Sequence, residues 1–396
     1  MMKEKKNGFR VHLRCLEMNN FIIPSLYFSN NNTDWKQQRL GDLVSIYSGW
    51  TPSEFKIADE HFGYMFIKVD DLNRTTREQT TSKMHVEEHK RLKKIKKGSI
   101  IFPKRGAAIM TNKIRILKKE SYMDTNMMSL EAKNIDINFL YSLLQKEKLY
   151  KIADTSTLPQ INNKHIEPYL IYLPSMDEQK TIGLFFKNLD ELISLHQQEL
   201  DAFKRTKQGF LQKMFPKGEN IIPELRFSEF NDPWFISELS DIVSEISTGK
   251  SKYVKGNSTG NYHILGSTGV IGYEDSYEYE GDFLLTARVG ANAGQLYKYS
   301  GKVKITDNTV FIKGDNLTFI QPLLELFDLK KLSFGSGQPL IKTSQLKKLK
   351  LRVPLPSEQV KIGEFFRQLD EVIELKEQEI EALKQTKQGF LQKMFI

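Results

Sequence analysis

The stretch that decides the architecture occurs twice in the chain. Residues 178–215 read EQKTIGLFFKNLDELISLHQQELDAFKRTKQGFLQKMF, and residues 358–395 read EQVKIGEFFRQLDEVIELKEQEIEALKQTKQGFLQKMF. At this shift of 180 residues, 25 of 38 positions are identical. Both copies follow a Leu-Pro-Ser sequence, at 173–175 and at 355–357. Repetition on this scale indicates that one structural unit is used twice.

Each copy has the apolar spacing of a long helix with a single seam. Apolar residues recur at alternating steps of four and three, the pattern of a coiled coil. The predicted seam consists of Ile182, Phe186, Leu189, Ile193, His196, Leu200 and Phe203 in the first copy, and of Ile362, Phe366, Leu369, Ile373, Lys376, Ile380 and Leu383 in the second. The proline ahead of each copy, Pro174 or Pro356, blocks extension upstream. At 1.5 Å per residue, each helix is about 57 Å long.

The two helices can pack separately or with each other. Two amphipathic helices on separate domains are the simpler interpretation. We favour an antiparallel coiled coil, which gives the chain a pseudo-two-fold axis. This arrangement brings the polar seam residues His196 and Lys376 close together, and such a layer can fix the register of a coiled coil.

A second repeat, with a shift of 199 residues, precedes the helices. Residues 23–28 read IPSLYF and residues 222–227 read IPELRF, while Trp35 matches Trp234. The chain therefore alternates modules with helices. The predicted parts are an N-terminal segment (1–21), a first module (22–172), a first helical spacer (173–215), a second module (216–354) and a second helical spacer (355–396).

The modules have a mixed α/β composition and share only a skeleton. Predicted strands lie at 98–102, 169–173, 281–285 and 309–312, and predicted helices at 139–150 and 320–332. Arg105-Gly106 resembles Arg288-Val289-Gly290, and residues 124–127 resemble 307–310. The predicted fold class is α/β (mixed α+β), with two globular modules separated by two long helices. Nearly duplicated connectors between divergent modules indicate one scaffold that carries two different contact surfaces.

Positive charge is concentrated in the modules. The net charge of the chain is +9, which makes nucleic acid a plausible partner. Residues 36–172 hold 24 Lys and Arg against 16 Asp and Glu, and residues 235–354 hold 15 against 12; the helical segments 177–215 and 355–396 sum to 0 and −2. Arg and Asn can pair with guanine and adenine edges, and Lys with phosphates. The candidate DNA-binding residues are Lys104, Arg105, Asn112, Lys113, Arg115, Lys250, Lys252, Tyr253, Arg288 and Asn292. The dense basic run at 90–97 can equally be a solvated face.

Several classes of protein are excluded by what the sequence lacks. No apolar run approaches the roughly 18 residues of a membrane helix. The single cysteine, Cys15, excludes an internal disulfide framework, and a reducing cytoplasm is the expected location. Residues 247–251 end like a phosphate-binding loop, but Ser244 stands where that loop needs glycine. Residues 85–89 have the letters of an inverted zinc-protease motif, but in a polar stretch with no apolar face. We therefore predict no catalytic residue and no metal ligand.

The whole arrangement resembles the specificity subunit of a type I restriction-modification system. The residues that carry the resemblance are the two modules, the Glu-Gln start of each helix, and the shared Gln-Gly-Phe-Leu-Gln-Lys-Met-Phe ending. Residues 337–341, Gly-Gln-Pro-Leu-Ile, are typical of the end of a target recognition domain. The first 20 residues depart from the pattern.

The resemblance implies a non-catalytic protein of host defence. Each target recognition domain would read one half of a bipartite, asymmetric DNA site, and the helices would set the gap between the halves. Two methyltransferase subunits, and two restriction subunits in the full enzyme, would be the protein partners. S-adenosylmethionine, ATP and magnesium would belong to those partners. No base-reading residue is carried over, since recognition residues vary within the family.

Two alternatives remain open at this point. A coiled-coil adaptor that joins two proteins without reading DNA explains the helices, but not the positive charge of the modules. A self-contained DNA-modifying enzyme is disfavoured because methyltransferase, helicase and nuclease motifs are absent from the sequence.

Overall fold

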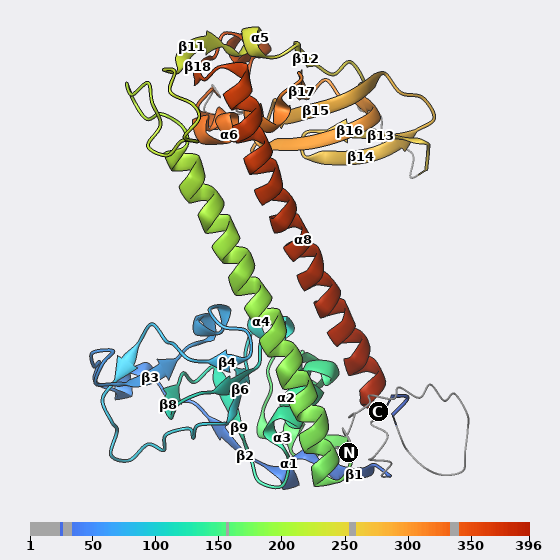
Figure 1. Cartoon of the computed structure of the whole chain (residues 1–396). Coiled ribbons are helices and arrows are strands. Elements are labelled where there is room, and N and C mark those ends of the chain that lie inside the picture. Colours follow the sequence, from blue (N-terminus) through green and yellow to red (C-terminus); the bar gives the residue numbers. More distant parts are fainter. Residues whose placement is uncertain (1–23, 27–33, 156–157, 253–258, 333–339) are drawn as a thin grey trace, which may run out of the picture. The chain divides into compact units, whose positions relative to one another are not determined.

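The computed structural model describes residues 24–26, 34–155, 158–252, 259–332 and 340–396 (Figure 1). The chain divides into two compact units: unit 1 contains residues 1–198 and 378–396, and unit 2 contains residues 199–377. Two long helices, α4 (Met176–Lys213) and α8 (Pro356–Met394), each contribute one part to either unit. Within the described ranges, no helix combines the length and the hydropathy that a membrane span requires.

Unit 1 carries two sheets and a short ladder. The five-stranded sheet has the order β2 (Val44–Ser48), β9 (Met127–Ala132), β6 (Ile100–Pro103), β7 (Arg115–Leu117), β4 (Glu78–Gln79). The three-stranded sheet has the order β5 (His85–Val86), β3 (Tyr64–Ile67), β8 (Ser121–Met123), and β1 (Lys36–Arg39) pairs with β10 (Leu170–Leu173). The α-helices are α1 (Leu40–Leu43), α2 (Ile137–Glu147) and α3 (Asn163–Ile166), and the 3-10 helices are η1 (Pro52–Glu54), η2 (Val69–Asn73), η3 (Ala107–Thr111) and η4 (Leu149–Ile152).

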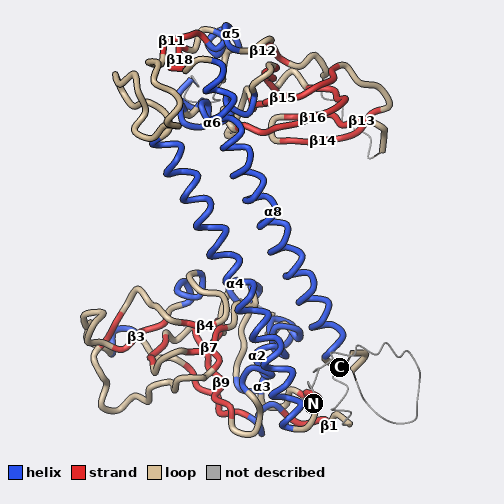
Figure 2. The backbone as a smooth tube through the Cα atoms, in the orientation of Figure 1, coloured by secondary structure: helices blue, strands red, loops and turns tan. Residues whose placement is uncertain are grey.

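Unit 2 carries one larger sheet and an equivalent ladder. The six-stranded sheet has the order β12 (Glu245–Thr248), β17 (Thr309–Lys313), β15 (Tyr279–Ala287), β16 (Leu296–Ile305), β13 (Tyr262–Gly266), β14 (Gly269–Glu274). β11 (Phe235–Glu238) pairs with β18 (Lys350–Val353). The helices are α5 (Leu239–Ile242), α6 (Leu317–Phe327), η5 (Leu329–Leu332) and α7 (Thr343–Lys347). Figure 2 shows the strands of the large sheet grouped on one side of α6. The mixed α/β fold predicted for both modules is confirmed.

The central strands are apolar on both faces, because both faces are covered. In β6, Ile100 and Phe102 belong to the core that includes α2, whereas Ile101 faces a second core on the other side of the sheet. In β15, Leu284 faces the core with α6, whereas Phe283 belongs to a separate cluster. This alternation is the two-residue period of a strand.

Two predicted helices end earlier than their apolar pattern. α2 ends at Glu147 and α6 at Phe327, and a 3-10 turn follows each helix. The residues after these helices, Lys148 and Asp328, both have φ 61°, and a positive φ stops an α-helix. The apolar spacing continued through this break, so the sequence pattern alone did not locate it.

Aromatic side chains at the same four positions pack each module against the long helices. In unit 1, the ring of Phe395 lies 5.2 Å from Phe139, 5.7 Å from Phe186 and 6.2 Å from Trp35. In unit 2, Phe215 takes the place of Phe395. Its ring lies 5.9 Å from those of Phe319 and Phe366 and 5.8 Å from that of Trp234. The last phenylalanine of each helix ending is therefore a core residue, and the buried Met214 and Met394 also belong to these cores.

Within each unit, the segments of α4 and α8 run in opposite directions. In unit 1, Phe185 meets Phe390 at a centroid distance of 5.2 Å, and in unit 2 Phe210 meets Phe365 at 4.8 Å. Every residue of the predicted seam is at least partly buried. Ile182, Phe186, Leu200, Ile362, Phe366 and Ile380 are buried, and Leu189, Ile193, His196, Phe203, Leu369, Ile373, Lys376 and Leu383 are half-buried.

The polar seam residues have acidic partners that we did not predict. The Nδ1 of His196 lies 3.3 Å from a carboxylate oxygen of Glu379 in unit 1, and the Nζ of Lys376 lies 3.1 Å from one of Glu199 in unit 2. The position of these two glutamates beside the seam became clear only with both helices in place.

The entry to each long helix is fixed by a glutamine. The side-chain amide of Gln179 donates to the carbonyl of Pro174, and that of Gln359 donates to the carbonyl of Pro354. Pro174 is therefore equivalent to Pro354, whereas Pro356 is the first residue of α8, a position where proline is tolerated. The two Leu-Pro-Ser sequences are thus two residues out of register, which corrects the match made on letters alone.

Candidate nucleic-acid interface

Each module has a corner where three strands of its main sheet end or begin. In unit 1, Ser48 at the end of β2 lies opposite Met128, and Pro103 at the end of β6 lies opposite Met127. In unit 2, Thr248 at the end of β12 lies opposite Val310, and Ala287 at the end of β15 lies opposite Thr309. These registers make the two corners equivalent. We call each of them the strand-end corner.

A glycine at each corner allows the backbone to approach another segment closely. The N–H of Gly49 donates to the carbonyl of Met127 at 3.2 Å, and that of Gly249 donates to the carbonyl of Thr309 at 3.0 Å. A Cβ added at Gly49 would lie 2.0 Å from the carbonyl oxygen of Asp124, and one at Gly249 would lie 2.1 Å from that of Ile305. Sequence comparison missed this pair, although residues 48–49 read Ser-Gly and residues 248–249 read Thr-Gly.

A basic residue occupies the same place at both corners. The N–H of Lys104 donates to the carbonyl of Asn126 at 2.8 Å, and the carbonyl of Lys104 accepts from Ile161 at 2.9 Å. The N–H of Arg288 donates to Asn308 at 3.0 Å, and its carbonyl accepts from Ile341 at 2.9 Å. Arg288 is therefore equivalent to Lys104 and not to Arg105, which corrects the sequence match by one residue.

Two of the unit 1 candidates point into the protein. Lys104 is buried, its Nζ donates to the hydroxyl of Ser48 at 2.8 Å, and burial lowers the pKa of this lysine below its usual value. Arg115 is also buried, and its guanidinium donates to the carbonyl of Leu72 at 2.5 Å and to that of Ile114 at 2.7 Å. Burial lowers the pKa of Arg115 as well. Both side chains thus hold strand ends and loops together.

The other unit 1 candidates differ in their availability. Asn112 has φ 46°, and its Oδ1 accepts from the backbone N–H of Leu149 at 3.0 Å, which makes it a loop anchor. Lys113 is half-buried, and its Nζ donates to the Oδ1 of Asn73. Arg105 is exposed, and its backbone bridges to Gln160. Of these three, Arg105 is the cation that faces outward at the corner.

Four of the five unit 2 candidates lie at the strand-end corner or in the loop beside it. Lys250 and Lys252 are exposed on either side of Ser251, whose N–H donates to the carbonyl of Ile305 at 3.1 Å. Arg288 is half-buried, and its Nε has no hydrogen-bond partner among the described residues. Asn292 is exposed in the loop that follows Arg288. The fifth candidate, Tyr253, lies outside the described residues.

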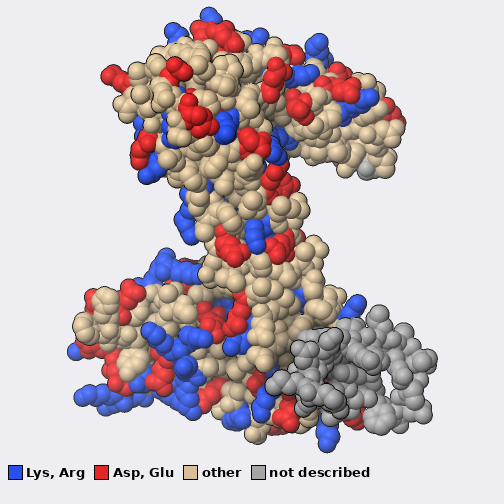
Figure 3. Space-filling model, in the orientation of Figure 1, with Lys and Arg blue, Asp and Glu red and all other residues tan. Residues whose placement is uncertain are grey.

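The basic run at 90–97 is partly neutralised by its surroundings. Lys93 donates to the hydroxyl of Tyr47 at 2.5 Å, Lys94 pairs with Glu88 at 2.7 Å, and Lys96 pairs with Glu131. Lys90, Arg91 and Lys97 are exposed. Figure 3 shows Lys and Arg side chains in patches over the module of unit 1, interspersed with acidic groups. Surface pairs of this kind contribute little and can exchange for phosphate.

The zinc-protease letters at 85–89 are not arranged in the structure as a set of metal ligands. His85 belongs to the short strand β5, and the Nδ1 of His89 accepts hydrogen bonds from the backbone N–H groups of Arg91 and Leu92. In the part of the chain that the structure describes, no three His, Cys, Asp or Glu side chains are grouped as metal ligands would be.

Comparison with known proteins places this geometry in a family. The type I restriction modification DNA specificity domain matches residues 32–205 and 231–385, one match for each module and its helix. The MjaVIII specificity subunit of a type I restriction enzyme from Methanocaldococcus jannaschii is 24% identical over 403 residues, covering 90% of this chain and 91% of that protein. The EcoprrI specificity subunit of Escherichia coli is 28% identical over 112 residues, 28% of each chain.

Solved structures show the same fold at low sequence identity. The S subunit of a type I restriction-modification system from M. genitalium superposes with a TM-score of 0.68 at 15% identity, covering 95% of this chain and 99% of that one. A chain from a study of complex assembly in the type I R-M system gives a TM-score of 0.51 at 16% identity, covering 91% and 97%. With two family matches that together span most of its length, this chain belongs to the family of type I restriction-modification specificity subunits.

Proposed function

We propose that this chain is the DNA sequence-recognition subunit of a type I restriction-modification enzyme, and that each module reads one half of a bipartite, asymmetric site. The observation that carries this proposal is the presence of two family matches, each covering a module whose strand-end corner has the same backbone but different outward side chains. Shared backbone supports a shared mode of binding. Different side chains support different half-sites.

The side chains proposed to reach DNA are the outward ones. In unit 1 they are the exposed Arg105 and the half-buried Lys113; in unit 2 they are Lys250, Lys252, Arg288 and Asn292. Arg and Asn suit base edges in the major groove, and Lys suits phosphates. Lys104, Asn112 and Arg115 are left out of the proposed interface, because their polar groups are already bonded inside the module.

The proposed partners are two methyltransferase subunits and, in the full enzyme, two restriction subunits. Leu192 and Leu195 on α4, and Val372 and Leu375 on α8, are exposed apolar side chains at repeat-related positions. Exposed apolar side chains on a helix suit protein contacts, so we assign methyltransferase docking to these two places. The helices would set the gap between the half-sites. In this proposal the chain is non-catalytic and binds no cofactor, and S-adenosylmethionine, ATP and Mg²⁺ are used by the partners in the cytoplasm.

A genome-wide methylation map tests the proposal. Cells that express this chain with a compatible methyltransferase subunit are compared with cells that lack this chain. The expected result is a new methylated motif in two parts with a fixed gap. Unchanged methylation, with the complex shown to assemble, would contradict the proposal and favour an adaptor that does not read DNA.

A further inference from the structure

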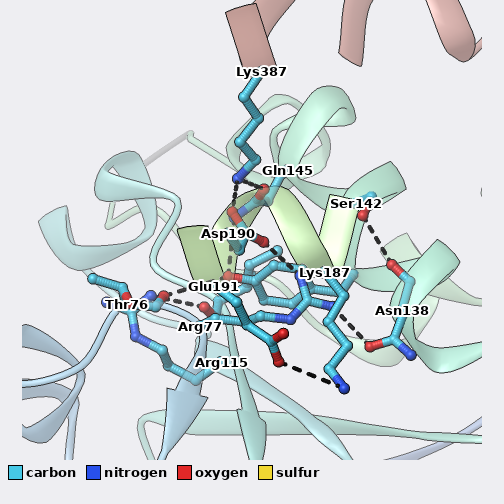
Figure 4. A network of polar contacts seen from close by, with 12 residues as sticks. Thr76, Arg77, Arg115, Asn138, Ser142, Gln145, Lys187, Asp190, Glu191 and Lys387 are labelled. Carbon is cyan, nitrogen blue, oxygen red and sulfur yellow. Dashed lines mark hydrogen bonds and ion pairs between the residues drawn. The ribbon is translucent and has the colours of Figure 1, made fainter. Parts of the chain in front are cut away.

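A largely buried carboxylate in unit 1 joins both long helices to the module. Asp190 on α4 contacts the Nη1 of Arg77 through Oδ2 at 2.5 Å and the Nζ of Lys387 on α8 through Oδ1 at 2.6 Å. The same Nζ donates to Gln145 of α2 at 2.6 Å. Figure 4 shows Asp190 between Arg77 and Lys387. We call these four residues the Asp190 cluster.

Arg77 connects this cluster to the main sheet of the module. Its Nη2 donates to the Oδ1 of Asn138 at 2.7 Å, and its guanidinium carbon lies 4.3 Å from the ring centroid of Tyr141. The backbone carbonyl of Arg77 accepts from Ile116 in β7 at 2.9 Å, and the next two residues form the edge strand β4. A change in the angle of the sheet on the helices would therefore break directional bonds to Arg77.

Unit 2 repeats this arrangement with Asp370 on α8. Its Oδ1 lies 2.7 Å from the Nζ of Lys207 on α4, and its Oδ2 lies 3.5 Å from the Nζ of Lys298 in β16. Lys207 also contacts Glu325 of α6 at 3.1 Å. Burial lowers the pKa of Lys207, but the bonds to Asp370 and Glu325 outweigh burial and raise it. These four residues form the Asp370 cluster.

The module cations reach these carboxylates from unrelated parts of the chain. Asp190 and Asp370 are repeat-related, as are Lys387 and Lys207. Arg77 precedes an edge strand of one sheet, whereas Lys298 lies within β16 of the other. Because the two sheets differ in strand order, common descent of the helix repeat does not account for a module cation at the same carboxylate in both units. A shared requirement for a module cation at this position accounts for it.

Burial makes these contacts more directional than surface ion pairs. The exposed fractions of the Arg77, Asp190 and Lys387 side chains are 6%, 11% and 15%. In the Asp370 cluster, Lys207 and Asp370 are 13% and 28% exposed, and Lys298 is 46% exposed. Removing one partner of a buried pair leaves an uncompensated charge, whereas a half-exposed pair is replaced by water at little cost. Loss of one partner should therefore cost more in the Asp190 cluster than in the Asp370 cluster.

We propose that Asp190 and Asp370 are positioning residues for DNA recognition, which fix the angle of each module's sheet on its helix segments and thereby the gap that the protein accepts between half-sites. This inference rests on the proposed function. It goes beyond that function because it assigns gap selectivity to two side chains that do not face the strand-end corners.

Asp190→Asn tests the inference directly, with Glu191→Gln as the matched control. Glu191 is the next residue on α4, is 58% exposed and pairs only at the surface with Lys187. The complex with the methyltransferase subunit is given DNA duplexes that carry the wild-type half-sites with the native gap, or with a gap one base pair shorter or longer. For Asp190→Asn, the preference for the native gap should fall about tenfold with unchanged half-sites. Glu191→Gln should keep the wild-type preference.

A purely structural role gives a different result. In that case Asp190→Asn lowers methylation equally at every gap, and the inference is overturned. If this variant does not assemble, Lys298→Gln decides, because the half-exposed Lys298 can be replaced without burying an unpaired charge. Its expected effect on gap preference is smaller, about threefold. An unchanged preference in Lys298→Gln would overturn the inference.

A distance measurement separates this inference from the proposed function. Spin labels are placed in unit 1 by Lys97→Cys on the module and Lys180→Cys on α4, both exposed, in a Cys15→Ser background. Asp190→Asn should broaden the distance distribution, and Glu191→Gln should not. A distribution that stays narrow in Asp190→Asn overturns the inference without any DNA. Failure of the proposed function shows separately, as absence of methylation by the wild-type chain.

Discussion

Unit 1 carries a five-stranded and a three-stranded sheet, whereas unit 2 carries a single six-stranded sheet. Both units nevertheless have the same three strands next to the helices, in the orders β2-β9-β6 and β12-β17-β15, and the same four aromatic positions behind them. The units diverge beyond the third strand. The molecule thus uses one frame twice and attaches a different sheet extension to each copy.

The length difference between the modules lies mainly in this extension. Gly249 and Gly49 differ by 200 positions, Arg288 and Lys104 by 184, and Ile341 and Ile161 by 180. Of the 20 residues by which unit 2 is shorter over this span, 16 are therefore lost between the corner glycine and the corner cation (200 − 184). The segment between these two points can vary in length because the frame is closed by other parts of the chain.

The largest loss of stability is expected from equivalent substitutions in the two aromatic cores. Phe395→Ala should destabilise unit 1 and Phe215→Ala should destabilise unit 2, each by about 3–5 kcal/mol, because each ring fills the contact between two helices and a module. Hydrogen exchange read by mass spectrometry should show faster exchange in the module concerned and little change in the other. A large effect of only one substitution would contradict a frame used twice.

A somewhat smaller effect is expected at the corner glycines. Gly49→Ala and Gly249→Ala should each cost about 3 kcal/mol, because the new Cβ would overlap a backbone carbonyl that cannot move freely. Urea unfolding followed by circular dichroism measures the cost. Gly209→Ala and Gly389→Ala are the controls, since an added Cβ meets nothing within 4 Å there. These helical controls should stabilise by about 0.5–1 kcal/mol.

Substitution of an outward cation should change the sequence preference of its own module only. Arg105→Ala should relax one half-site and Arg288→Ala the other, at a cost of about 1–3 kcal/mol if the side chain reads a base. Binding to duplexes with single substitutions in each half-site measures this effect. A phosphate contact would instead weaken all sequences alike. If Arg288→Ala changed neither affinity nor preference, Arg288 would be removed from the interface.

The smallest effect is expected from moving the chain ends. In unit 1 the backbone N–H of Leu26 and the hydroxyl of Ser25 both donate to the carbonyl of Lys393, at 2.9 Å and 3.1 Å. In unit 2 the N–H of Leu225 donates to Lys213 at 2.9 Å in the same way. A circular permutant that joins residue 396 to residue 1 and opens at 216–220 should therefore retain DNA recognition. An insoluble permutant beside a soluble parent would contradict this equivalence.

Repetition and periodicity predicted the architecture well, because both depend on patterns that extend over many residues. The long helices and the α/β modules could be read from the 180-residue shift and the apolar spacing. The predictions were wrong where the alignment of the two repeats rested on only a few residues. The match between the two Leu-Pro-Ser sequences was wrong by two residues, and the match between Arg105 and Arg288 was wrong by one. Only hydrogen bonds to the backbone identify the equivalent positions.

The direction of a charged side chain was not predictable from its neighbours. Lys104 and Arg115 lie in basic stretches that indicate an exposed patch, yet both are buried, because Ser48, Leu72 and Ile114 supply acceptors from elsewhere in the chain. Arg77 gave no signal, as its partner Asp190 is 113 residues away. Such long-range pairs become visible only when the fold brings them together.

Exchange of one sheet tests most directly the claim that one frame presents two different DNA-reading sheets. Replacing residues 245–313 by residues 45–131 joins the new segment at two equivalent paired positions, because Ser45 lies opposite Glu131 and Glu245 lies opposite Lys313. If one frame presents two different readers, the exchanged chain should assemble and its methylation map should show the half-site of the first module twice, with that of the second module absent. A map that keeps the original second half-site would contradict the account.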